Sequence, residues 1–145
     1  MTHGFLKACT LSPALRVADC AYNAEQTVSS MQQAAKDGAQ LAVFPELGLT
    51  GYTCGDLFLQ QPLQAAAEAA LLTVLAASAE LPLVGIVGLP VAVDCKLYNC
   101  AAVFCRGRLL GLVPKTHIPN YVEFYEKRHF FPAPADTRTI RFAGC

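Results

Sequence analysis

Leu41-Ala42-Val43-Phe44-Pro45-Glu46-Leu47 is an apolar run that ends in a proline and then a carboxylate. Four consecutive apolar residues leave no side for solvent, so residues 41–44 are predicted to form a short strand buried on both faces, as in parallel sheets. Pro45 has no N–H to give to a neighbouring strand and holds Phe44 extended, so the strand ends there. Glu46 is therefore expected at the carboxyl end of the strand, where open α/β sheets bind their ligands.

A second strand of the same design follows later in the chain. Residues 108–113 form an apolar run that passes into Pro114 and Lys115, so a proline and one charge again end a strand. If the two strands are neighbours, Glu46 and Lys115 meet in one cleft, where each offsets the other's desolvation. Such a carboxylate can act as a general base and such an ammonium can stabilise an oxyanion. A structural buried salt bridge accounts for the same pair equally well.

Helix and strand patterns alternate over most of the chain, which predicts the α/β class with βαβ units and a mixed sheet. Asn23 is expected to cap a helix that Gly38 ends. Pro62 marks the first residue of a second helix, and Arg106-Gly107 marks a tight hairpin. The expected elements are strands at 5–11, 41–44, 83–93, 97–105, 108–113 and 139–142, helices between Asn23 and Gly38 and between Pro62 and Leu81, and a long ordered loop at 115–136.

The composition narrows the classes of partner. The 145 residues suit one domain, and their 54% hydrophobic content exceeds the usual range, which is about 45–50%. Eleven basic and eleven acidic side chains cancel, which argues against nucleic acid and anionic membranes as partners. The apolar stretch 81–93 is broken by prolines and is shorter than the roughly 20 residues of a transmembrane helix. Without an apolar signal segment, a cytoplasmic location is expected.

The seven cysteines predict neither a disulfide framework nor a metal site. Their number is odd and no Cys-x-x-Cys pair occurs, which argues against a framework of disulfides. Cys95, Cys100 and Cys105 are five residues apart, which is no zinc spacing, and the three histidines share no ligand spacing. We interpret the cysteines as buried free thiols that act as small hydrophobes.

Two groups of motifs resemble a known family. Phe44-Pro45-Glu46-Leu47 and Leu49-Thr50-Gly51-Tyr52, then Pro114-Lys115 and Pro119-Asn120-Tyr121, resemble the nitrilase or carbon–nitrogen hydrolase superfamily. More narrowly, longer stretches resemble the N-terminal glutaminase domain of the glutamine-dependent NAD+ synthetases. These stretches are residues 49–58, 97–101, 115–121 and 124–130. The resemblance covers nearly the whole chain, with the motifs in the family's order.

The resemblance implies an α-β-β-α sandwich in which a Glu-Lys-Cys triad hydrolyses the side-chain amide of glutamine through a cysteine thioester. Glu46 would be the general base that takes the thiol proton. Lys115 would stabilise the oxyanion, and Glu126 would orient Lys115 or the leaving ammonia. Tyr121 and Tyr52 would line the glutamine pocket.

The chain departs from the family pattern at the nucleophile. The family's cysteine lies on a later strand in an acidic-flanked motif, and none of the cysteines here fits it. Cys54 is too close to the Glu46 motif, Cys100 and Cys105 fall inside earlier strands, and Cys145 is the last residue. The synthetase domain is also absent. We therefore expect residues 1–145 to be the first half of a glutaminase domain, a fragment inactive by itself and prone to associate through uncovered apolar sheet faces.

The full-length protein that the resemblance implies would use the released ammonia to amidate adenylated deamido-NAD. ATP and Mg2+ would bind the synthetase domain, with no cofactor in residues 1–145, and the full-length protein would be a homo-oligomer. Two alternatives remain: a stand-alone nitrilase-family amidase, and a non-catalytic binding or assembly module that holds a zwitterion between Glu46 and Lys115. A downstream ATP-binding Ser-Gly-Gly-x-Asp-Ser loop would distinguish the synthetase from the stand-alone amidase.

Overall fold

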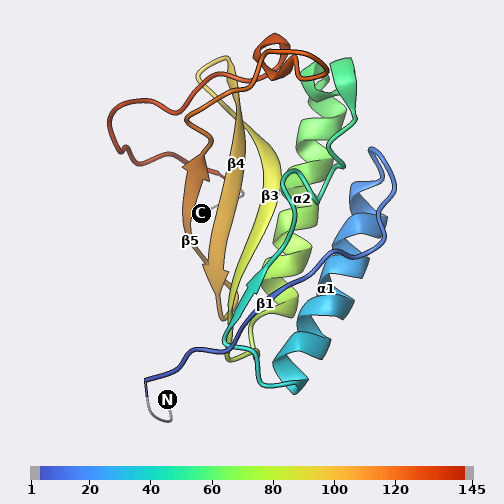
Figure 1. Ribbon diagram of the computed structural model, residues 1–145, viewed down its shortest axis with the longest axis vertical. Coiled ribbons are helices and arrows are strands. Elements are labelled where there is room, and N and C mark those ends of the chain that lie inside the picture. Colours follow the sequence, from blue (N-terminus) through green and yellow to red (C-terminus); the bar gives the residue numbers. More distant parts are fainter. Residues whose placement is uncertain (1–3, 143–145) are drawn as a thin grey trace.

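The computed structural model describes residues 4–142, which form one mixed five-stranded sheet with two α-helices. The strands lie side by side in chain order (Figure 1). β1 to β3 are parallel, whereas β4 is antiparallel to both β3 and β5. The elements are β1 (Ala8–Thr10), α1 (Cys20–Lys36), β2 (Leu41–Val43), the 3-10 helix η1 (Gly55–Leu59), α2 (Gln61–Ala77), β3 (Val84–Val93), β4 (Lys96–Cys105), β5 (Arg108–Pro114) and the 3-10 helix η2 (Glu126–Arg128). The predicted α/β class, with a βαβ unit and a mixed sheet, is confirmed.

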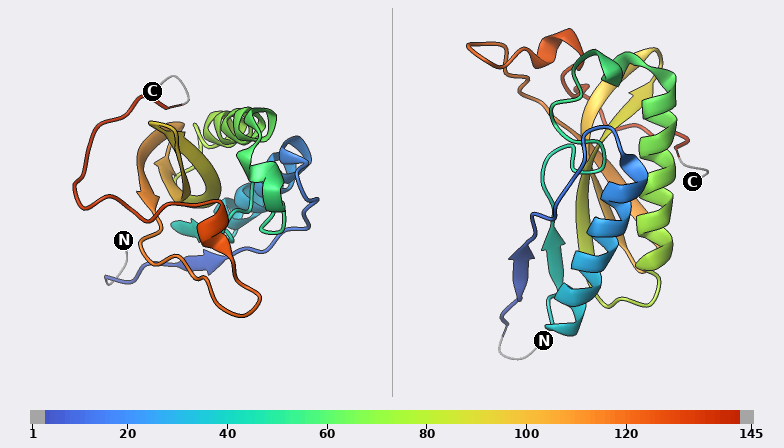
Figure 2. Two further views of the ribbon diagram at one scale, coloured as in Figure 1. Left: turned by 90° about the horizontal axis from the view of Figure 1, so that it is seen from above. Right: turned by 90° about the vertical axis from the view of Figure 1, so that its right-hand side faces the viewer.

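Both long helices lie against the same face of the sheet (Figure 2). Side chains around β2 alternate accordingly, because Ala42 and Phe44 are buried while Leu41 and Val43 are half-buried. The second half of β4 alternates in the same way. The prediction that residues 41–44 are buried on both faces is therefore wrong. Residues 4–142 supply helices to one face of the sheet and leave the opposite apolar face partly open.

Helix α1 begins earlier than its sequence pattern indicated. Asp19 caps it by accepting a hydrogen bond from Tyr22 N at 3.2 Å. Asn23 is buried inside the first turn, and its Nδ2 donates to Arg16 O at 2.8 Å and to Leu49 O at 3.2 Å. The predicted Asn23 cap is wrong because this amide ties the loop after β2 to the helix instead.

Helix α2 and the hairpins follow their sequence patterns more closely. Pro62 is the second residue of α2 rather than the first, which its missing N–H also permits. Arg106 and Gly107 both have positive φ, as do Asp94 and Cys95 in a turn between β3 and β4 that the sequence had not signalled. Positive φ at both central residues suits the twist of a two-residue hairpin. An apolar stripe of α2 is buried against the rest of the fold: Leu63, Ala67, Ala70, Val74 and Leu75.

The segment after β5 is a long loop, as predicted. Phe131 N donates to Leu97 O at 2.8 Å and Ala133 N donates to Lys115 O at 3.0 Å, so the loop returns across the ends of β4 and β5. The strand predicted at 139–142 is wrong, because none of these residues pairs with a strand in the described range 4–142. Several of them instead line a pocket of about 620 Å³ beside β4 and β5.

The backbone after β2 crosses directly over Gly88 of β3. A Cβ atom on Gly88 would clash with Leu47 N and lie 2.8 Å from Pro45 O. The crossing is held by a hydrogen bond from Leu49 N to Gly88 O at 3.1 Å, and Leu47 adopts a positive φ of 51°. Glycine at this position therefore lets the segment that carries Glu46 pass over β3 towards β4.

Gly88→Ala should destabilise the fold, because the atoms that an added methyl group meets belong to the backbone and cannot rotate away. We expect the free energy of unfolding to fall by about 2 kcal/mol or more, measured by urea denaturation. Gly111→Ala in β5 is the matched control, since an added Cβ there has no atom within 4 Å. Equal stability of the two variants would contradict the close crossing.

Buried thiols fill space in the core. Cys20, Cys54 and Cys100 are buried, whereas Cys95 in the β3–β4 turn is exposed. Burial raises the pKa of the Cys100 thiol from 9.0 to about 12. Burial, with smaller contributions from Cys54 and Asp19, raises the pKa of Cys20 to about 11. These thiols stay protonated near neutral pH, as small hydrophobic side chains would require.

The raised pKa of Cys100 predicts a loss of stability at alkaline pH. Well below pH 9.0 the thiol is protonated in both states, whereas between pH 9.0 and about pH 12 the unfolded chain loses a proton that the folded chain keeps. The free energy of unfolding then falls by about 1.4 kcal/mol per pH unit for this group. Cys100→Ala should make the slope between pH 9 and pH 11 shallower by that amount in urea denaturation series. Cys95→Ala is the control and should keep the wild-type slope; an unchanged slope in Cys100→Ala would refute the assignment.

Candidate active site

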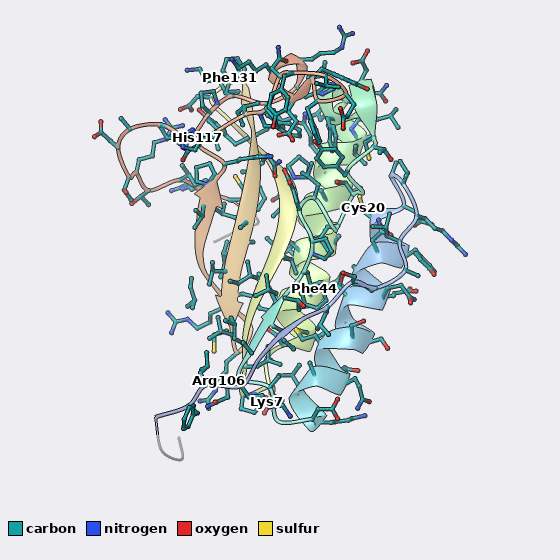
Figure 3. All side chains as sticks on the ribbon, in the orientation of Figure 1. Lys7, Cys20, Phe44, Arg106, His117 and Phe131 are labelled. Atoms are coloured by element: carbon teal, nitrogen blue, oxygen red, sulfur yellow. The ribbon has the colours of Figure 1, made fainter. Side chains whose placement is uncertain are left out.

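The two charged residues that follow prolines meet at one edge of the sheet. Strand β5 runs in the same direction as β2, because two antiparallel steps separate β5 from β3. Lys115 Nζ lies 2.7 Å from Glu46 Oε1. The sequence argument had required β2 and β5 to be neighbours. They are not, because β3 and β4 lie between them. The segment that crosses over Gly88 carries Glu46 across β3 towards Lys115. The two side chains meet at the end of the sheet where Figure 3 labels His117 and Phe131.

A second carboxylate holds the other side of the ammonium. Lys115 Nζ lies 3.0 Å from both oxygens of Glu126. The Glu126 side chain is 7% exposed, whereas that of Glu46 is 42% exposed. Tyr52 OH donates to Glu126 Oε1 at 2.6 Å. The structure thus brings together Glu46, Lys115, Glu126 and Tyr52, which we call the charged cluster. In it, the Lys115 ammonium bridges an exposed carboxylate, Glu46, and a buried one, Glu126.

The protonation states of the site follow from these contacts. Burial alone would lower the pKa of Lys115, but hydrogen bonds to Glu46 and Glu126 outweigh it and raise the pKa above its ordinary value. Burial and the hydrogen bond to Glu126 raise the pKa of Tyr52 far above its ordinary value. At neutral pH the site therefore offers a fixed ammonium and a neutral phenol. The ammonium can stabilise a negative oxygen that forms during a reaction.

Tyr121 lies apart from the four residues just described. Its side chain is 66% exposed and packs edge to face on Phe124, with ring centroids 5.8 Å apart. Within residues 4–142 it makes no hydrogen bond to Glu46, Lys115 or Glu126. Its role in a glutamine pocket stays a prediction.

Asn99 joins the site although sequence reasoning had not selected it. Asn99 Nδ2 donates a short hydrogen bond to Glu46 Oε1, and Asn99 O accepts from Lys115 N at 2.8 Å. Asn99 is 4% exposed. A signal was present in the sequence, because an amide inside the apolar strand 97–105 must find a partner when buried.

A second polar cluster, formed by Asp56, Arg128 and His129, was also missed. Asp56 accepts from Arg128 Nε at 2.6 Å and Nη2 at 2.8 Å, and lies 3.1 Å from His129 Nε2. The hydrogen bonds to Arg128 and His129 hold the pKa of Asp56 well below its usual range. The cluster ties η1 to η2, the turn that begins with Glu126.

The described cysteines make no hydrogen bond to the charged cluster. Cys54 Sγ donates to Thr50 O at 3.2 Å, and burial raises the pKa of its thiol, which disfavours the thiolate that a nucleophile needs. Cys145 lies outside the described residues. In the part of the chain that the structure describes, no group of three or more His, Cys, Asp or Glu residues could hold a metal ion. No helix in residues 4–142 has both the length and the apolar character to cross a bilayer.

Comparison with protein families identifies the family of the chain. A model of the family described as carbon–nitrogen hydrolase matches residues 7–144. The chain belongs to the carbon–nitrogen hydrolase family. The matched range includes all four residues of the charged cluster and Asn99, so the hydrolase resemblance of the motifs is confirmed at family level.

Individual relatives narrow the likeness. The chain is 42% identical over 142 residues to the glutamine-dependent NAD(+) synthetase of Mycobacterium tuberculosis, covering 98% of this chain and 21% of that protein. It therefore spans about a fifth of that relative's length. The predicted resemblance to the N-terminal part of these synthetases is confirmed.

Solved structures show the same fold. The glutamine-dependent NAD(+) synthetase from Cytophaga hutchinsonii matches with a TM-score of 0.86 at 24% identity, covering 92% of this chain and 23% of that one. An amidase from Nesterenkonia sp. AN1 matches with a TM-score of 0.75 at 19% identity, covering 96% of this chain and 52% of that one. That structure is of a mutant of the amidase and shows covalent addition of the acetamide moiety of fluoroacetamide at the active-site cysteine. At these identities the likeness establishes the nitrilase-type fold.

Lys115→Met should leave the buried Glu126 carboxylate without its cation. We expect the free energy of unfolding at neutral pH to fall by roughly 1–3 kcal/mol, the cost of an uncompensated charged group. The double variant Lys115→Met/Glu126→Gln should recover part of this loss, because a neutral amide needs no cation. Lys127→Met, an exposed change in the same loop, serves as the control. Equal stability of the single and double variants would show that the buried charge is not the cause.

Proposed function

We propose that this chain forms part of a glutaminase domain that hydrolyses the side-chain amide of glutamine. The observation that carries the proposal is the Lys115 ammonium between Glu46 and Glu126, at 2.7 Å and 3.0 Å. A structural salt bridge explains one carboxylate partner, but the half-exposed Glu46 remains open to a ligand. The 42% identity to a glutamine-dependent synthetase supports glutamine as the substrate.

Glu46 and Lys115 then each have a chemical task. Glu46 takes the proton of a cysteine thiol, and the thiolate attacks the amide carbon of glutamine. Lys115 stabilises the oxyanion of the tetrahedral intermediate. Glu46 returns the proton to the nitrogen as the C–N bond breaks, which releases ammonia and leaves a thioester. Water then attacks the thioester while Glu46 accepts its proton. The C–S bond breaks, Glu46 returns the proton to the departing thiolate, and glutamate is released.

The nucleophilic cysteine is proposed to come from a chain segment beyond residues 1–145. Two observations support this: Cys20, Cys54 and Cys100 are buried with raised pKa values, and the chain spans about a fifth of its synthetase relatives. The partly open sheet face opposite the helices supports a further layer from the same polypeptide. We accordingly expect residues 1–145 alone to be inactive on glutamine and prone to associate.

In the whole protein, the ammonia would amidate adenylated deamido-NAD in an ATP-dependent synthetase domain. ATP and Mg2+ are proposed to bind that second domain, as the resemblance to the synthetases implies. Glutamine and deamido-NAD are the proposed substrates, in a cytoplasmic homo-oligomer. A stand-alone amidase is the weaker alternative, because the amidase likeness rests on fold at 19% identity.

Glutamate release from glutamine tests the proposal. The full-length protein should release glutamate, whereas residues 1–145 alone should not. In the full-length protein, Glu46→Gln and Lys115→Met should each lower kcat/KM by at least about 100-fold, while the exposed control Lys127→Met keeps wild-type activity.

Three outcomes would contradict parts of the proposal. Glutamine binding without turnover in the full-length protein would favour the binding or assembly module. Faster turnover of simple aliphatic amides than of glutamine would favour the stand-alone amidase. Turnover by residues 1–145, abolished by mutating one of their own cysteines, would overturn the missing nucleophile.

A further inference from the structure

The two oxygens of the Glu46 carboxylate have different partners. Oε1 accepts hydrogen bonds from both Asn99 Nδ2 and Lys115 Nζ. Oε2 receives no hydrogen bond from any side chain in residues 4–142. An ionised carboxylate oxygen offers about two acceptor positions. Both positions of Oε1 are therefore occupied, and those of Oε2 are open.

We propose that Asn99 is a positioning residue that reserves Glu46 Oε2 as the basic atom of the site. This inference rests on the proposed function, because it assigns the proton acceptor of that reaction. By occupying the second position on Oε1, the Asn99 amide fixes the rotation of the carboxylate about its last bond. The Glu46 side chain is 42% exposed, so the carboxylate is accessible from outside the cluster.

The Asn99 side chain is held firmly enough for this task. The residue is 4% exposed and lies opposite Pro90 in the β3–β4 ladder. Its carbonyl accepts from Lys115 N at 2.8 Å, on the side of β5. A residue that bonds towards β5 makes no ladder hydrogen bond with its partner in β3, so Pro90 is tolerated there without an N–H. One residue thus fixes the Lys115 backbone with its carbonyl and the Glu46 carboxylate with its amide.

The assignment has a definite proton balance. A thiol proton moves to Oε2 while Oε1 keeps its hydrogen bonds to Asn99 and Lys115, so the base changes charge without turning. The same oxygen then gives the proton to the leaving nitrogen. Asn99 neither gains nor loses a proton and touches no substrate atom.

The test uses the full-length protein with Asn99→Ala and Asn99→Asp. Asn99→Ala removes the donor, and Asn99→Asp replaces it with a carboxylate of nearly the same shape that must share a proton with Glu46. We expect kcat for glutamine hydrolysis to fall about 10- to 100-fold in both, with KM changed less than about threefold. The acidic limb of the pH–rate profile should move to higher pH by at least about 0.5 unit in Asn99→Ala and further in Asn99→Asp.

Cys100→Ala is the matched control. Cys100 is the next residue of β4, is equally buried and faces the other side of the sheet. The Cys100→Ala variant should keep the acidic limb of the pH–rate profile at the same pH as in the wild type. If both Asn99 variants lower activity and melting temperature but keep the wild-type limb, Asn99 is merely structural and the proposal is overturned.

A second readout separates this proposal from the proposed function. Iodoacetamide alkylates the nucleophilic thiol without glutamine. The pH dependence of this alkylation rate should move to higher pH in Asn99→Ala and further in Asn99→Asp. If glutamine is not hydrolysed by the wild type but the alkylation profiles move as expected, glutamine is the wrong substrate and the Asn99 assignment stands. If glutamine is hydrolysed but neither profile moves, the Asn99 assignment is wrong and the proposed function stands.

Discussion

The close approach of one backbone segment to Gly88 is the constraint on which the site depends. Strand β2 is three residues long and is separated from β5 by two other strands. Glu46 reaches Lys115 because residues 45–47 pass over β3 at a position without a side chain. The segment is fixed on its far side as well, since Asn23 Nδ2 donates to Leu49 O and Thr50 Oγ1 donates to Leu47 O. A helix, a strand and a glycine together set the position of one carboxylate.

Charge balance explains why a second carboxylate, Glu126, accompanies the Glu46–Lys115 pair. A single Lys115–Glu126 pair would carry no net charge. It would also be inaccessible to a ligand, because the Glu126 side chain is 7% exposed and is also bound by Tyr52. The second carboxylate gives the cluster a net charge of −1 when all three groups are ionised. Uptake of one proton by Glu46 would bring that charge to zero. The buried carboxylate keeps Lys115 charged and placed in both states, so the open carboxylate is the group free to change.

The sequence was sufficient for features that depend on local pattern. Apolar periodicity identified both helices, and Arg106-Gly107 identified its hairpin. Pro45 and Pro114 correctly marked the strand ends that carry Glu46 and Lys115. Features that depend on tertiary contacts were missed. Asn23 has the composition of a cap but is drawn inside by Leu49 O and Arg16 O. The Asp56–Arg128 contact joins residues 72 positions apart, which no local pattern encodes.

The meander of β3, β4 and β5 bears on the order in which the chain folds. Its two connections are two-residue turns with positive φ, so its contacts are local in sequence. Parallel pairing of β2 with β3 closes a much longer loop through α2, and such pairings form slowly. Asn99 and Lys115 are therefore expected to be in register before β2 docks. Glu46 reaches Lys115 only when β2 docks, so the charged pair forms with the least local part of the sheet.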